Sequence, residues 1–157
     1  METSPLDVPL DLATWVAPQT IAHWIREEID QLDRSKPEVR GVLSHPPDAR
    51  PQVILSVLLF AYSTQRFTNS EILAACHSDP VMKQLCDGQA PFADEIGHFR
   101  RTHRALLEFL LGQLLIRAVR EKFVEAGQLP PGLQRSLKNR AVDQIDTARH
   151  LSSLEGQ

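Results

Sequence analysis

The sequence predicts an all-α protein: a compact multi-helix domain with a helix-turn-helix-like unit and a long helix in its C-terminal half. Three observations support this fold class. Apolar residues recur at spacings of three and four along most of the chain, which is the period of one helix face. All eleven prolines lie outside these periodic segments, as expected of residues that delimit helices. No segment alternates apolar and polar residues well enough to serve as a strand of a sheet.

The first half of the chain is expected to hold two helices joined by a loop. Pro18 suits the first turn of a helix that ends near Asp33. Residues 35–50, rich in proline, serine and aspartate, are expected to form the loop. The segment after Pro51, residues 53–62, is the most hydrophobic of the chain. We interpret it as a central helix buried nearly all round, because leucine, alanine and aromatic residues outnumber β-branched ones.

Two short helices are expected next, each with a polar residue at its start. Ser70 is expected to cap the first, and Asp79 with Pro80 provides the cap and the first turn of the second. A turn around Gly88 then precedes a further helix, which Asp94 is expected to cap. The chain therefore has three helix starts in close succession.

The longest apolar pattern runs from Ile96 to Gly127. No proline interrupts it, so an unbroken helix would be roughly 50 Å long; a break near His103 is an equally good interpretation. The prolines after Gly127 prevent its continuation, and residues 137–154 are expected to form a C-terminal amphipathic helix. We therefore divide the chain into an N-terminal extension (1–17), a helical domain (18–127) and a C-terminal helical tail (128–157).

Composition and charge exclude several classes of protein. With 157 residues, 42% hydrophobic and 24% charged, the chain resembles an ordinary globular domain. Its longest nearly apolar run is about half the roughly 20 residues of a bilayer span, so no membrane insertion is expected. Two cysteines, Cys76 and Cys86, are too few for a disulfide framework, so we expect a cytoplasmic location. Because the net charge is −3, binding of DNA must rest on a local patch.

Residues 68–104 have the layout of a DNA-binding unit, in which two short helices and a turn precede a helix rich in basic residues. Such a unit lays its last helix in the major groove. With Ile96 and Phe99 in the core, the opposite face is expected to turn basic side chains toward solvent, with Arg100 at its boundary. There they reach phosphates or base edges. The candidate DNA-binding residues are His98, Arg100, Arg101 and Arg104.

The same basic residues also have a purely structural interpretation. Clustered arginines are common on solvated helix faces, where they pair with residues such as Glu95 and Glu108 or with nothing. His98 and His103 are five residues apart and do not share a helix face closely enough to hold a metal together. The sequence contains no arrangement typical of a catalytic triad and no glycine-rich phosphate loop. We therefore expect no metal, no cofactor and no enzymatic activity.

Four motifs follow one another in a recognisable order. They are the proline-opened hydrophobic segment 50–66 with Tyr62 in its second half, then Ser70-Glu71-Ile72, Asp79-Pro80 and residues 99–103. This order resembles the InsH-type N-terminal domain of bacterial insertion-sequence transposases of the DDE class, over residues 9–127. The resemblance implies that the domain recognises the terminal inverted repeats of its element, with residues 94–104 as the DNA-contacting helix.

The catalytic domain of the resembled transposases has no counterpart in this sequence. Only thirty residues follow Gly127, too few for an RNase H-like sheet and its metal-binding acids. The expected function is that of a non-catalytic DNA-binding module, a truncated transposase or a domesticated regulator, whose partner is DNA such as inverted repeats or a promoter. The alternative is a helical protein–protein interaction or oligomerisation module that has lost DNA binding. A homo-oligomer is compatible with both.

Overall fold

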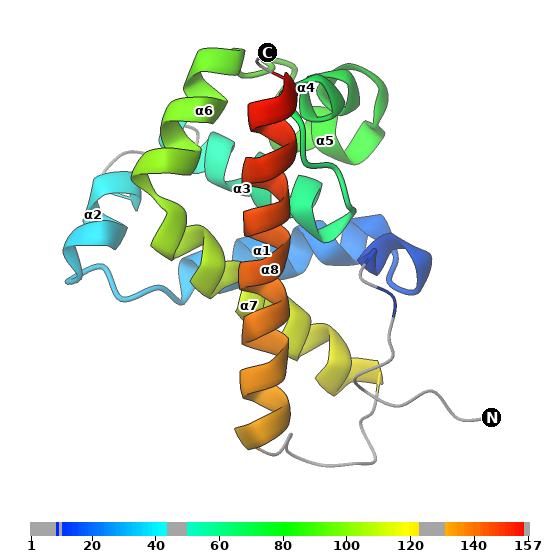
Figure 1. Cartoon of the computed structure of the whole chain (residues 1–157), viewed down its shortest axis with the longest axis vertical. Helices are drawn as coiled ribbons and strands as arrows, with labels where there is room; N and C mark the ends of the chain where they lie inside the picture. Colours follow the sequence, from blue (N-terminus) through cyan, green and yellow to red (C-terminus); the bar gives the residue numbers. More distant parts are fainter. Residues whose placement is uncertain (1–8, 10, 44–49, 123–130, 156–157) are drawn as a thin grey trace.

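The computed structural model describes residues 9, 11–43, 50–122 and 131–155, and these form eight α-helices with no β-strand among them. The all-α fold class is therefore confirmed (Figure 1). The elements are η2 (Leu12–Thr14, a 3-10 helix), α1 (Pro18–Asp30), α2 (Pro37–Leu43), α3 (Arg50–Ser63), α4 (Asn69–Ser78), α5 (Pro80–Leu85), α6 (Ala93–Thr102), α7 (Arg104–Lys122) and α8 (Pro131–Glu155).

Helix α3 lies at the centre of the fold, as its hydrophobic sequence predicted. All seven other α-helices pack against it. From Ile54 to Ser63 every side chain except that of Ser56 is buried, so no face of its C-terminal part remains for solvent. Each large apolar side chain buried in this way contributes about 1.5–3 kcal/mol relative to an exposed one. The core therefore forms around one helix rather than between two layers.

The region between α1 and α3 differs from the expected loop. Helix α1 begins at Pro18, as predicted, but ends at Asp30, about one turn before the predicted end at Asp33. Residues 37–43 then form α2, which buries three apolar side chains. The loop prediction was wrong here because Pro37, counted as a loop residue, occupies the first turn of a helix, where proline is well tolerated. Residues 44–49 lie outside the described part of the chain.

Helix α4 begins one turn earlier on its capping residue than predicted. The cap is Thr68, not Ser70: Thr68 Oγ1 accepts a hydrogen bond from the Glu71 backbone N–H at 3.1 Å, and Glu71 Oε1 accepts one from the Thr68 N–H at 3.3 Å. This reciprocal arrangement is a capping box, which satisfies two backbone donors at once. The prediction for α5 is confirmed, since Asp79 Oδ1 accepts hydrogen bonds from the first turn of that helix.

The long apolar pattern is divided at His103, which separates α6 from α7. The predicted break is therefore confirmed, and the unbroken helix is excluded. The predicted cap at Asp94 was wrong, because Phe92 is the capping position and Glu95 Oε1 accepts its backbone N–H at 2.9 Å. Asp94 lies within the first turn instead. The predicted end of the pattern at Gly127 falls outside the described residues.

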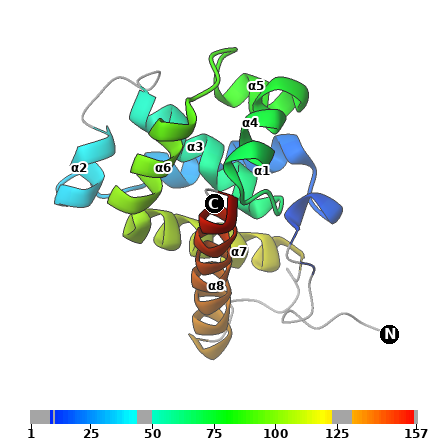
Figure 2. The ribbon, with the colours of Figure 1, turned by 45° about the horizontal axis from the view of Figure 1, so that its top comes forward.

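Helix α8 crosses α7, its most extensive packing partner, and its C-terminal end lies near α4 and α6 (Figures 1 and 2). Leu137, Ala141 and Ile145 are among the residues it buries. Gly112 permits the close crossing, since a Cβ atom there would lie 3.6 Å from the Cα atom of Lys138. None of the described helices combines the length and the apolar character needed to cross a membrane.

Candidate nucleic-acid interface

Helix α6 carries the four residues that the sequence selected. It buries Ile96 and Phe99, as predicted, and leaves His98 and Arg101 exposed on the opposite side. Its N-terminal end is tied to α3 by a two-pronged ion pair, in which Arg50 Nη2 and Nε donate to the Glu95 carboxylate at 2.8 and 3.3 Å. Glu95 is therefore occupied by Arg50, and not by an arginine of its own helix.

Arg100 lies in the interior rather than at the edge of a DNA-facing surface. Its Nη2 donates to the Phe67 carbonyl oxygen at 2.7 Å, and its Nη1 donates to Ser152 Oγ on α8. Its guanidinium lies 5.7 Å from the centre of the Tyr62 ring, within the range of a cation–π contact. These contacts join α6 to α3, to the segment before α4 and to α8. Arg100 therefore holds the fold together.

Arg104 does not point freely toward solvent, and that part of the prediction was wrong. It begins α7, donates from Nε to Glu108 Oε1 at 2.7 Å, and forms an ion pair with Asp146 of α8. Hydrogen bonds to Asp146 and then to Glu108 raise the pKa of the Arg104 guanidinium. The pairing with Glu108 follows the structural interpretation of the arginine cluster. The sequence could not show the second partner, because α8 comes forty-two residues later in the chain.

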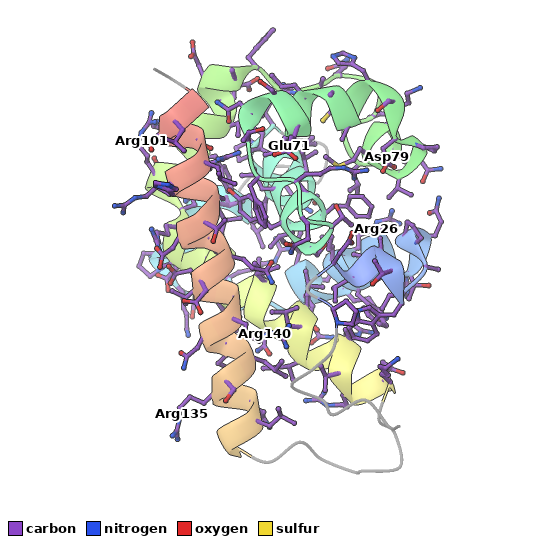
Figure 3. The ribbon with its side chains drawn as sticks, turned by 45° about the vertical axis from the view of Figure 1, so that its right-hand side comes forward. Arg26, Glu71, Asp79, Arg101, Arg135 and Arg140 are labelled. Atoms are coloured by element: carbon purple, nitrogen blue, oxygen red, sulfur yellow. The ribbon has the colours of Figure 1, made fainter. Side chains whose placement is uncertain are left out.

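Helices α3, α6, α7 and α8 together enclose a cleft of about 570 Å³. Arg100, Arg101 and Arg104 line it, and α8 adds a fourth arginine, Arg149; no aspartate or glutamate is among the lining residues. Within the described ranges, no carboxylate forms an ion pair with Arg101 or with Arg149. Figure 3 shows Arg101 beside the C-terminal half of α8. The arrangement concentrates positive charge where two helices meet.

Sequence reasoning did not select Arg149. A signal was present, because Ile145, Arg149 and Ser152 follow the helical spacing of three and four residues and so share one face of α8. What the spacing does not reveal is that this face lies opposite α6. His98, although selected, does not line the cleft; its Nε2 lies 3.5 Å from Thr102 Oγ1 on the exposed surface.

Burial alters the protonation of two groups near this region. It raises the pKa of Tyr62 to about 12, so the phenol stays protonated at neutral pH. It lowers the pKa of His103 below its ordinary value, and the nearby His98 lowers it further, which favours a neutral ring at the α6–α7 junction. The positive charge of the site therefore comes from arginines and does not depend on His103.

Neither metal chemistry nor a known family provides a further guide to the site. The residues with described positions contain no group of three or more His, Cys, Asp or Glu side chains that could hold a metal ion. No family model matches the chain, and comparisons with curated proteins and with solved structures gave no match. What defines the site is its geometry: an all-α domain with an arginine-lined cleft between its last helix and α6.

Proposed function

We propose that this chain is a non-catalytic DNA-binding module that contacts DNA through the exposed side of α6 and the adjoining end of α8. The observation that carries the proposal is the pair Arg101 and Arg149, which line one cleft without a neutralising carboxylate among its lining residues. Guanidinium groups bind phosphate oxygens in a bidentate manner. His98, exposed on the same helix, extends this surface.

Arg100 and Arg104 have a different role in this proposal from the one that the sequence suggested. Both are engaged by α8 and by neighbouring backbone or carboxylate groups. We assign them to the scaffold that orients α6, and we assign the DNA contacts to His98, Arg101 and Arg149. The DNA is a set of transposon inverted repeats or a promoter, and the protein acts in the bacterial cytoplasm as a truncated or domesticated transposase.

A salt titration of DNA binding tests this proposal. Duplex DNA of mixed sequence is titrated with the parent, Arg101→Gln, Arg149→Gln and the control Arg26→Gln, which removes an equally exposed arginine on α1 far from the cleft (Figure 3). Each lost phosphate contact should lower the slope of log affinity against log salt by about 0.9. Failure of the parent to bind at low salt, or equal slopes for all four proteins, would reject the proposal.

A second candidate function is an interaction or oligomerisation module, and Phe109 of α7 favours it. Its side chain is 49% exposed. It lines a separate cleft with Leu32 and Val39 that measures about 350 Å³. Exposed large apolar groups at concave sites are typical of protein-binding surfaces. If this function is correct, sedimentation will show self-association that Phe109→Gln abolishes, and DNA binding will be absent.

A further inference from the structure

The arginine-lined cleft contains a second type of donor that contact with the DNA backbone does not explain. Tyr62 of α3 lines the cleft although only 1% of its surface is exposed. Within the described part of the chain, no hydrogen bond joins its hydroxyl to another group. A buried hydroxyl usually has a partner, because leaving it without one has a free-energy cost. The Tyr62 hydroxyl is therefore an unused donor at a polar cleft.

The walls of the cleft also change character with depth. Leu107 of α7 and Ile145 of α8 are both buried and both line it, whereas Arg101 and Arg149 are exposed. The cleft therefore offers an apolar inner surface next to an outer pair of cations. Its volume of about 570 Å³ lies within the roughly 300–1,000 Å³ typical of small-molecule sites. These properties complement a molecule with one anionic end and one apolar end.

We propose that this cleft binds a small organic oxyanion, a phosphate or carboxylate group carried on an apolar body. The anionic group lies between Arg101 and Arg149, the apolar body packs on Leu107 and Ile145, and the Tyr62 hydroxyl donates to the ligand. Since Arg101 belongs to α6 and Arg149 to α8, the ligand joins the two helices. This site does not depend on whether the same surface binds DNA.

Calorimetric titration without DNA tests the site with four probes. Phenyl phosphate and benzoate carry both parts, inorganic phosphate carries only the anion, and phenol carries only the apolar ring. We expect phenyl phosphate or benzoate to bind at least about tenfold more tightly than inorganic phosphate and phenol. The tighter of the two organic anions distinguishes a phosphate ligand from a carboxylate ligand.

Variants of the chain locate the binding. Arg101→Gln and Arg149→Gln should each weaken binding of the organic anion about tenfold, the usual effect of losing one charged hydrogen bond. Tyr62→Phe should weaken it severalfold while leaving the melting temperature unchanged, which separates a ligand contact from a structural role. Arg26→Gln, on α1, should bind as the parent does. The proposal is overturned if neither organic anion binds saturably, or if the two arginine variants bind as tightly as the parent.

Discussion

Arg100 donates a hydrogen bond from Nη2 to the carbonyl oxygen of Phe67 across 2.7 Å, which joins α6 to the segment that connects α3 with α4. The two residues are thirty-three positions apart in the sequence. With its other contact to Ser152, this guanidinium links three parts of the fold that do not follow one another along the chain. The residue that a sequence pattern assigns to DNA is thus a structural one.

The first prediction concerns the stability role of Arg100. Arg100→Ala should lower the free energy of unfolding by about 1–3 kcal/mol, because it leaves partly buried acceptors without their donor. The exposed neighbour Arg101→Ala should change it by less than about 0.5 kcal/mol. Urea denaturation of the two variants, followed by circular dichroism, measures both values. Equal stability of the two variants would show that the Arg100 contacts contribute little.

The second prediction separates the ring of Tyr62 from its hydroxyl. The ring packs 6.0 Å from that of Phe67 and is almost fully buried, so Tyr62→Ala should cost about 3–5 kcal/mol of stability. Tyr62→Phe should cost nearly nothing, since the hydroxyl has no hydrogen bond within the described residues. Thermal denaturation of both variants checks this difference. A clear loss of stability in Tyr62→Phe would mean that the hydroxyl already has a partner in the folded protein.

The third prediction tests the capping box of α4. Thr68→Ala removes the side chain that accepts the Glu71 backbone N–H, and should destabilise the protein by about 1 kcal/mol. Ser78→Ala is the matched control at the other end of α4, where the hydroxyl only donates back to Ala74 at an exposed position. Chemical denaturation should show a lower midpoint for the first variant alone. A similar midpoint for both would contradict the assigned cap.

The fourth prediction is a pH dependence that arises from the Arg50–Glu95 pair. The hydrogen bond from Arg50 lowers the pKa of the Glu95 carboxyl below its ordinary value of 4.5. The unfolded chain therefore takes up this proton at a higher pH than the folded one. The contribution of the pair is complete above about pH 4.5 and is lost as the pH falls through the lower pKa of the folded state.

Glu95→Gln should remove this part of the acid sensitivity. Plotted against pH below 4.5, the unfolding free energy of Glu95→Gln should fall less steeply than that of the parent, while above pH 6 the variant should be the less stable protein. Asp94→Asn, one residue earlier and exposed, is the control and should keep the slope of the parent. Parallel curves for Glu95→Gln and the parent below pH 4.5 would contradict the ion-pair assignment.

Features that depend on short stretches of sequence could be predicted. The apolar run of residues 53–62 predicted the central helix, because a segment without a polar face can only be buried. Asp79 and Pro80 predicted the start of α5, because capping is a contact between residues two or three positions apart. The core positions of Ile96 and Phe99 followed from helical spacing for the same local reason. Where several local signals competed, as at Thr68 and Ser70, the sequence selected the wrong cap.

The composition of the candidate site required the tertiary structure. The periodicity of α6 places Arg100, Arg101 and Arg104 on or near one side, but it carries no information on what lies opposite. The partners of two of them, Ser152 and Asp146, are more than forty residues away and meet them only because α8 folds back across α7. The same packing brings Arg149 to Arg101 and buries Tyr62 beneath them. Which arginines support the fold and which remain available to an anion was therefore decided by long-range helix packing, since charges pair through space without regard to their separation along the chain.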